Sequence, residues 1–177
     1  MEVIKPAFEQ NKTVIVFSID NCYVPYLGAA LTSLVANSSP DNFYDIVIFI
    51  ENISEINRRT LSDITKGRQN FSLRFFDITR YVQNHRDTLY VNSYFSIATY
   101  YRIFIPEIFS AFDRALYLDS DMIFNADVAE LAGIDLKGNL LGAVNDFGVL
   151  SDYHQKNDHF YKYIEQILKM KSWQSFM

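Results

Sequence analysis

Two aspartates, Asp119 and Asp121, follow the short apolar run Ala115–Leu118 and offer the clearest chemistry in this sequence. Residues at positions i and i+2 of an extended chain point to the same side, so the two carboxylates repel each other. The adjoining residues 115–118 and 122–124 contain no basic side chain. A divalent cation would relieve the repulsion, and Mg²⁺ and Mn²⁺ prefer such hard oxygen ligands. The pair predicts a metal site that binds a nucleotide's phosphates, although an acidic turn capping a hairpin fits it too.

A second candidate cluster, Asp20 and Tyr23, comes directly after the apolar run Thr13–Ile19. An aspartate can accept a hydrogen bond from the ring N–H of a nucleobase, and a tyrosine ring can stack on the base. The carboxyl ends of strands in an open α/β sheet face the ligand crevice, so we expect this cluster at the same edge as Asp119 and Asp121. Taken alone, the cluster also fits a turn aspartate beside a half-buried tyrosine.

Two further sets of polar residues could contact a sugar nucleotide. Ser96, Thr99 and Arg102 are spaced by three residues, so they share one face of a predicted helix, and Arg102 could hold a phosphate or a sugar hydroxyl. A solvated helix face is the alternative interpretation. Asp146 and Asn145 follow another apolar run and could bind sugar hydroxyls at a crevice edge, or form the turn that ends a strand.

The elements that position these residues follow from the apolar pattern. It predicts strands over five ranges: Thr13–Ile19, Tyr44–Ile50, Ser72–Ile78, Ala115–Leu118 and Leu140–Val144. It predicts helices over Leu27–Val35, Ser54–Gly67, Ser96–Phe104, Asp127–Leu131 and Phe160–Met170. Strands and helices alternate in the first half, which is typical of an α/β fold with a mostly parallel sheet covered by helices on both faces.

Composition limits the classes of protein that fit. The chain has 177 residues, enough for one domain over 1–177, and 49% of them are hydrophobic, which excludes intrinsic disorder. The net charge of −5 argues against a nucleic acid partner. The single cysteine excludes an internal disulfide. With no signal peptide and no apolar run long enough to span a bilayer, we expect a cytoplasmic protein or one peripheral to the inner face of the membrane.

Taken together, the candidate clusters resemble glycosyltransferase family 8, which includes bacterial lipopolysaccharide galactosyl- and glucosyltransferases and, more remotely, glycogenin. The resemblance runs from Val14 to Asp146. Its anchors are Asp20–Tyr23, Ser96–Ile103, Leu116–Asp121 and Gly142–Asp146, in this order and at this spacing. The family usually has an asparagine at the position of Cys22.

The resemblance implies a Rossmann-like GT-A fold and a retaining, metal-dependent transfer of a hexose. The donor would be UDP-glucose or UDP-galactose, and the acceptor a glycan or a lipid-linked saccharide. By this resemblance, Tyr23 would stack on uracil and Asp20 would accept a hydrogen bond from its ring N–H, while Ser96, Thr99 and Arg102 would flank the ribose, diphosphate or sugar. Asp119 and Asp121 would bind Mn²⁺ or Mg²⁺, and Asp119 and Ser120 would lie near the ribose or sugar. Asp146, together with Arg102, would act catalytically.

The family continues with a further strand and a late histidine, the third metal ligand, which this sequence does not include. We therefore expect a C-terminally truncated catalytic domain, which is either an active transferase or a non-catalytic nucleotide-sugar-binding fragment. A homo-oligomer is a further expectation.

Two other classes of protein use related motifs. Haloacid dehalogenase-type phosphatases place the aspartate pair on their first strand, usually with Thr two residues later, where Ile123 stands here. Nucleotidylyltransferases have a glycine-rich N-terminal loop, which is missing.

Overall fold

The computed structural model describes residues 3–10, 12–89, 96–144, 146–148, 151, 155, 161–167 and 169. The chain divides into two compact units, Met1–Ile134 and Asp135–Met177. The expected single domain over 1–177 stays a prediction. Among the described residues, no helix has the length and apolar character that a membrane crossing requires.

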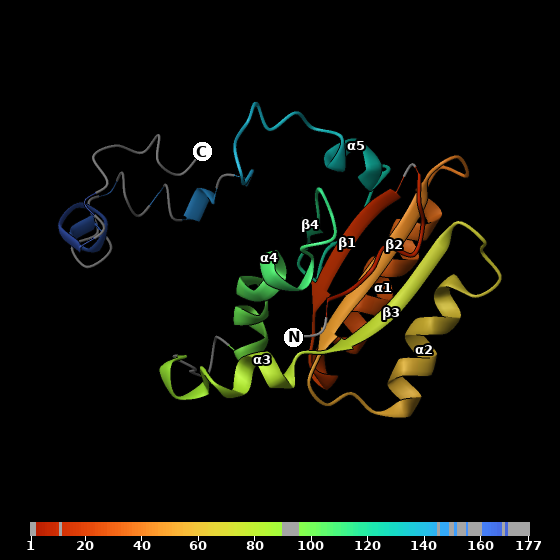
Figure 1. The fold of residues 1–177 in the computed structure, drawn as a ribbon, viewed down its shortest axis with the longest axis horizontal. Helices are drawn as coiled ribbons and strands as arrows, with labels where there is room; N and C mark the ends of the chain where they lie inside the picture. Colours follow the sequence, from red (N-terminus) through yellow and green to blue (C-terminus); the bar gives the residue numbers. More distant parts are fainter. Residues whose placement is uncertain are drawn as a thin grey trace. The chain divides into compact units, whose positions relative to one another are not determined.

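A four-stranded parallel sheet forms the centre of the first unit (Figure 1). Its strands are β1 (Lys12–Ser18), β2 (Phe43–Ile50), β3 (Phe71–Asp77) and β4 (Leu116–Tyr117), in the spatial order β3-β2-β1-β4. Every pair is parallel, with Val16 opposite Val47 in one register and opposite Tyr117 in the other. The predicted α/β fold with a mostly parallel sheet is confirmed, and all carboxyl ends meet at one edge.

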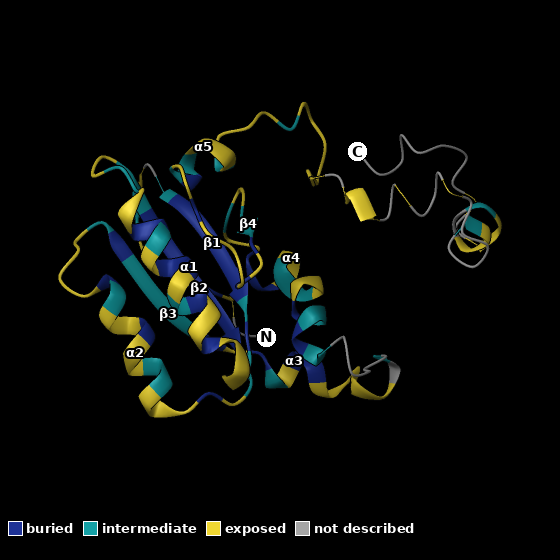
Figure 2. Ribbon diagram, turned by 180° about the vertical axis from the view of Figure 1, so that it is seen from behind, coloured by how far each residue is buried: buried dark blue, intermediate teal, exposed yellow. Residues whose placement is uncertain are grey.

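The central strands β1 and β2 are buried on both faces, as continuous apolar strands predict, whereas most of β3 is half-buried (Figure 2). Alternate residues of β1 and β2 serve opposite cores. Ile15 and Phe17 belong to a core with α1 (Val24–Ala36) and α2 (Glu55–Thr65). Val14 and Val16 belong to a second core that takes in α3 (Thr79–Gln83), the 3₁₀ helix η3 (Ile97–Phe104) and α4 (Ile105–Ile108). The prediction of helices on both faces is therefore confirmed.

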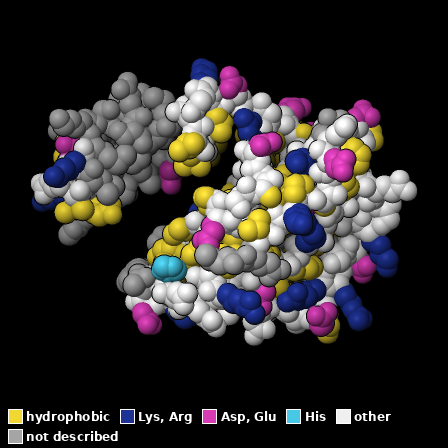
Figure 3. Space-filling view, in the orientation of Figure 1, with side chains coloured by type: hydrophobic (Ala, Val, Ile, Leu, Met, Phe, Trp, Pro, Cys, Tyr) yellow, Lys and Arg dark blue, Asp and Glu magenta, His cyan; other side chains and the backbone are white. Residues whose placement is uncertain are grey.

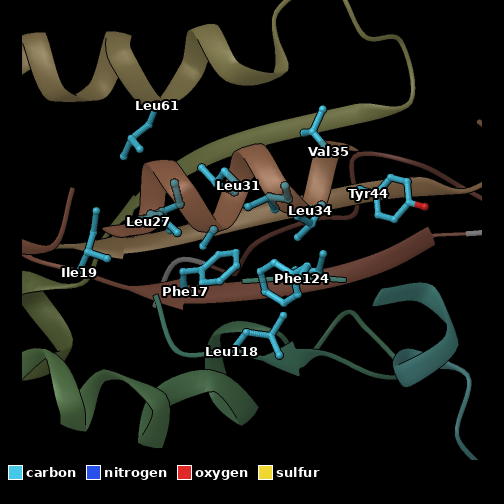
Figure 4. Packing of buried hydrophobic residues seen from close by; sticks show 14 of the residues in the cluster. Phe17, Ile19, Leu27, Leu31, Leu34, Val35, Tyr44, Leu61, Leu118 and Phe124 are labelled. Atoms are coloured by element: carbon cyan, nitrogen blue, oxygen red, sulfur yellow. The ribbon is translucent and has the colours of Figure 1, made fainter. Parts of the chain in front are cut away.

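Helix α1 packs on the first face through residues at three- and four-residue spacing. Leu27, Leu31 and Leu34 are each at most 1% exposed, and Figure 4 shows them pointing toward Phe17 and Phe124. Helix α2 begins after Ser54, whose hydroxyl accepts a hydrogen bond from the Asn57 N–H at 3.2 Å. Its outer face is solvated, and Figure 3 shows basic and acidic side chains interleaved over that part of the surface.

Three shorter helical segments complete the first unit: η1 (Asn21–Tyr23), η2 (Arg86–Thr88) and α5 (Val128–Ala132). Asp127 caps α5 by accepting from Ala129 N at 2.9 Å, and it also accepts from the Tyr44 hydroxyl at 2.8 Å, Asn42 and Ser39. Burial alone would raise the pKa of Asp127, but these hydrogen bonds outweigh it and lower the pKa below its ordinary value. Asp127 thus joins α5 to the start of β2.

Asp45 is a buried charge near the start of β2. It is 0% exposed and accepts two hydrogen bonds from Arg74 of β3, at 2.7 and 2.8 Å. The Ala7 N–H donates to the same carboxylate at 2.9 Å, and Arg74 also donates to the Lys5 carbonyl. This ion pair therefore fixes the N-terminal segment on the second face of the sheet.

The predicted helix over Ser96–Phe104 is present but differs in type. Residues Ile97–Phe104 form a 3₁₀ helix, and α4 follows directly, with Pro106 in its first turn. Proline lacks a backbone N–H, but a residue in the first turn has no intrahelical acceptor for one, so Pro106 does not end the helical segment. In a 3₁₀ helix, residues three apart align along one face, so the spacing of Ser96, Thr99 and Arg102 keeps its meaning.

In the second unit, the strand predicted over Leu140–Val144 is wrong. Leu140, Leu141 and Val144 are at least 80% exposed, and among the described residues no strand pairs with them. An apolar run needs a partner strand and a covering layer to become a buried strand, and the described part of the second unit supplies neither. A π-helical turn, η4, spans Tyr163–Ile167 within the predicted helix Phe160–Met170. Phe160, Leu168 and Met170 of that prediction lie outside the described residues.

Candidate active site

An open pocket of about 320 Å³ lies at the carboxyl edge of the sheet. Its lining comes from three places: the turn after β1, the residues after β2, and the start of η3. The lining residues are Ile19, Asp20, Asn21, Cys22, Glu51, Asn52, Ser96, Ile97, Ala98 and Tyr101. Of the site residues predicted from the sequence, Asp20 and Ser96 therefore share this pocket.

The turn after β1 is fixed by its own side chains. One oxygen of Asp20, Oδ1, accepts from the N–H groups of Cys22 at 2.9 Å and Tyr23 at 3.2 Å, which caps η1. Within the described residues, its other oxygen has no hydrogen bond. Asn21 donates to the Asn52 carbonyl at 2.7 Å and accepts from Ser54 N and from Asn57. Asn21 thus holds the loop after β2 against the turn after β1.

Glu51 directly follows β2 and lines the same pocket. Its Oε1 forms an ion pair with Arg86 of η2, and its Oε2 accepts from the Tyr101 hydroxyl at 2.6 Å. Tyr101 is 2% exposed. Burial, and then the hydrogen bond to Glu51, raise the pKa of Tyr101, so its hydroxyl stays protonated and donates.

Arg102, the next residue of η3, contacts the end of β4. Its guanidinium lies over the Tyr117 ring, 4.3 Å from the centroid, and its Nη2 pairs with Asp119 Oδ1 at 3.3 Å. Its Nε also donates to the Thr99 carbonyl at 3.0 Å. Burial raises the pKa of Tyr117, against the opposing effects of Ser18 and Arg102. The structure therefore brings together Arg102 and Asp119, two of the predicted site residues.

The residues after β4 alternate in burial. Leu118 and Ser120 are 6% exposed, whereas Asp119 and Asp121 are exposed, so both carboxylates lie on the solvent side of the chain as the spacing predicts. Three residues after Asp121, Phe124 is buried among Leu34 and Leu118 (Figure 4). The segment that carries the aspartates is thus held at both ends by buried side chains.

Helix α1 also holds the backbone of this segment. The Phe124 N–H donates to the Ser33 hydroxyl at 3.0 Å, and the Phe124 carbonyl accepts from Asn37 at 2.9 Å. Both polar backbone groups of Phe124 are therefore satisfied by α1 and its C-cap residue Asn37, which limits the conformations open to the preceding turn.

The donor set fits a hard divalent cation. Asp119 and Asp121 present exposed carboxylates, and within the described residues Asp121 has no hydrogen bond or ion pair. No cluster of three His, Cys, Asp or Glu side chains suitable for a metal occurs in the described part of the chain. Mg²⁺-type cations are commonly bound by one or two carboxylates together with substrate phosphates, so two protein ligands are compatible with such a site.

Other predicted site residues lie outside the pocket lining. Tyr23 is 41% exposed, and its ring contacts that of Tyr26, 57% exposed, at a centroid distance of 5.5 Å. Thr99 is half-buried on η3. Asp146 is exposed and belongs to the second unit, and Asn145, predicted beside it, lies outside the described residues. The roles assigned to these residues stay predictions.

Sequence reasoning missed three residues that build the pocket: Asn21, Glu51 and Tyr101. A signal for Glu51 was present, because it follows a buried strand in the same way that Asp20 follows β1. Asn21 lies in the turn after β1, which the sequence indicates, but its three hydrogen-bond partners lie about 30 residues further along the chain, after β2. Nothing in the local sequence distinguishes Tyr101 from its neighbour Tyr100.

Several glycosyltransferases are similar to this chain in sequence or in structure. Glycosyltransferase GlyB of Streptococcus pneumoniae is 32% identical over 136 residues, which cover 77% of this chain and 32% of GlyB. The apo structure of the bifunctional glycosyltransferase WbbM superposes with a TM-score of 0.83 at 28% identity, covering 96% of this chain and 30% of WbbM. The galactosyltransferase LgtC, in complex with donor and acceptor sugar analogues, superposes with a TM-score of 0.65 at 28% identity, covering 85% of this chain and 50% of LgtC.

The chain therefore spans at most half the length of these relatives. The fold shared with WbbM and LgtC is the GT-A glycosyltransferase fold, as expected. The model of glycosyl transferase family 8 matches residues 14–175, nearly the whole chain. On this match, the chain belongs to glycosyl transferase family 8.

Proposed function

We propose that this chain binds a UDP-hexose, UDP-glucose or UDP-galactose, and takes part in metal-dependent transfer of the hexose to a glycan or lipid-linked saccharide with retention of configuration. The observation that carries the proposal is the placement of η3. Ser96 of this segment lines the pocket that holds Asp20, and Arg102 pairs with Asp119 at the end of β4. Candidate groups for the base, the diphosphate and the metal are thus joined by one helix at one sheet edge.

The charges in this region suggest where each part of the donor binds. Among the described residues, the pocket is lined by the carboxylate of Asp20 and by no basic side chain, which disfavours phosphates but suits a nucleobase with a ring N–H. The cation Arg102 lies instead beside Asp119, where a metal would also add positive charge. We therefore assign the base to the pocket beside Asp20 and the diphosphate to the region of Arg102.

Asp119 and Asp121 would hold Mn²⁺ or Mg²⁺, which when bound supplies positive charge next to the departing diphosphate. Arg102 provides a second positive charge in the same region, beside Asp119. Such fixed charges stabilise the negative charge that develops on the leaving oxygen. Asp146 is proposed to face the donor sugar or the acceptor. LgtC is a galactosyltransferase, and this similarity supports a hexose as the proposed substrate class.

The test measures UDP released from UDP-glucose and UDP-galactose in the presence of Mn²⁺, with and without saccharide acceptors. Asp119→Asn and Asp121→Asn should abolish release, because each removes one carboxylate charge from the metal site. Asp113→Asn, a matched change at an exposed aspartate before β4, should leave release unchanged. Tight UDP binding without release would support the alternative, a non-catalytic nucleotide-sugar-binding fragment. Loss of activity in all three variants would contradict the assignment of the metal site.

A further inference from the structure

Glu51 uses both carboxylate oxygens to connect three elements at the pocket. Oε1 pairs with Arg86 of η2, and Oε2 accepts from Tyr101 of η3, while the residue itself extends directly from β2. The Glu51 side chain is only 17% exposed. Because a partly desolvated carboxylate needs partners, the Arg86 charge and the Tyr101 hydroxyl stabilise it in this position.

Tyr101 and Arg102 are adjacent, and they attach η3 to two different strands. Tyr101 binds the residue that follows β2, and Arg102 binds Tyr117 and Asp119 at the end of β4. Strand β1 lies between β2 and β4 in the sheet, so η3 crosses the carboxyl edge of three strands. The hydrogen bond from Tyr101 to Glu51 therefore fixes the rotation of η3 at the position directly before Arg102.

We infer that Glu51 is a positioning residue for donor binding, which acts through Tyr101 to set the place of Arg102 and of the pocket wall formed by Ser96. This inference rests on the proposed function. It assigns Glu51 no contact with the donor: both of its oxygens are engaged by protein groups, and its negative charge is balanced by Arg86.

The chain offers a matched comparison that separates a positioning role from a purely stabilising one. Tyr44, at the start of β2, also donates its hydroxyl to a carboxylate, Asp127, at 2.8 Å, and it is also buried. It lies at the opposite end of the same strand from Glu51. Tyr44→Phe and Tyr101→Phe each remove a hydroxyl-to-carboxylate hydrogen bond, one away from the pocket and one at it. Tyr44→Phe also removes the hydrogen bond that the Ser39 N–H donates to the Tyr44 hydroxyl at 2.9 Å.

The experiment titrates UDP into the full chain by calorimetry with saturating Mn²⁺ and records the Tm of each variant. Both Tyr→Phe variants should lower Tm. Only Tyr101→Phe should weaken UDP binding, by about 3- to 10-fold, the factor associated with one hydrogen bond. Glu51→Gln should weaken binding similarly. The double variant that combines Glu51→Gln and Tyr101→Phe should bind UDP no more weakly than the single variant with the lower affinity, because both changes act through one contact.

The possible outcomes separate this inference from the proposed function. If the wild type binds UDP and Tyr101→Phe binds it equally well, the positioning role is wrong and the proposed function stands. If Tyr44→Phe weakens UDP binding as much as Tyr101→Phe, the effect is one of general stability and the positioning role is again wrong. If the wild type does not bind UDP, both the proposed function and the role of Glu51 are overturned.

Discussion

Removing Arg102 should change metal binding and nucleotide binding in opposite directions. In the structure, Arg102 is the cation that pairs with Asp119, at 3.3 Å, while it also stacks on Tyr117. A metal that binds Asp119 must compete with this pair. Arg102→Ala frees the carboxylate and removes a repulsive charge, so Mn²⁺ alone should bind more tightly. The same change removes a group proposed to bind the diphosphate, so UDP with Mn²⁺ should bind more weakly.

The size of each effect follows from exposure. The Arg102 and Asp119 side chains are 44% and 60% exposed, and ion pairs this exposed contribute about 0–1 kcal/mol. Mn²⁺ alone should therefore bind up to about 5-fold more tightly to Arg102→Ala. A hydrogen bond to a charged group is worth about 1.5–3 kcal/mol, so UDP in the presence of Mn²⁺ should bind about 10- to 100-fold more weakly.

The assay is a Mn²⁺ titration followed by electron paramagnetic resonance of the free ion, together with calorimetry of UDP at saturating Mn²⁺. Arg114→Ala is the control, because Arg114 is an exposed arginine that donates to the carbonyls of Ala132 and Ile134 instead of pairing with an aspartate. It removes the same charge and should change neither affinity. The reasoning is refuted if Arg102→Ala shifts both affinities in the same direction, or if Arg114→Ala reproduces its effects.

Three further predictions concern stability and the pocket wall. Because the pKa of Asp127 is lowered in the folded chain, its stabilisation is present above about pH 4 and is lost as pH falls further. Asp127→Asn should therefore lower the unfolding free energy by about 1–3 kcal/mol at pH 7, and thermal denaturation at pH 3 should show a smaller difference. Arg74→Met leaves the fully buried Asp45 without its counter-ion and should cost about 3–5 kcal/mol in urea denaturation, whereas Arg59→Met on exposed α2 should cost far less. Asn21→Ala releases the loop after β2 and should weaken UDP binding several-fold in calorimetry, and an unchanged affinity would contradict its role in the pocket wall.

The sequence predicts the strands of the first unit because each is a short apolar run, and β1 and β2 become buried on both faces. β1, β2 and β3 lie within one residue of their predicted ends. The same reasoning fails for Leu140–Val144, whose side chains are exposed. A strand depends on a partner as well as on its own residues, and a local pattern does not contain the partner.

The candidate site is predictable to the extent that it depends on strand ends. This rule singled out Asp20 and Asp119 as candidates, and in the structure Asp20 shares a pocket with Ser96, the residue before η3, while Asp119 pairs with Arg102 of η3. The contacts that hold the site together were not predictable. The bond from Tyr101 to Glu51 joins residues 50 positions apart, and no periodicity records such a pairing.

The most direct test of the account is a calorimetric titration of UDP with and without Mn²⁺, on the wild type and on Asp121→Ala. Asp121 is exposed and has no partner among the described residues, so its loss should not disturb the fold. We predict that Mn²⁺ tightens UDP binding to the wild type and has no such effect on Asp121→Ala. UDP binding that is independent of Mn²⁺ and unaffected by the substitution would contradict the central claim that these aspartates hold a metal for the sugar nucleotide.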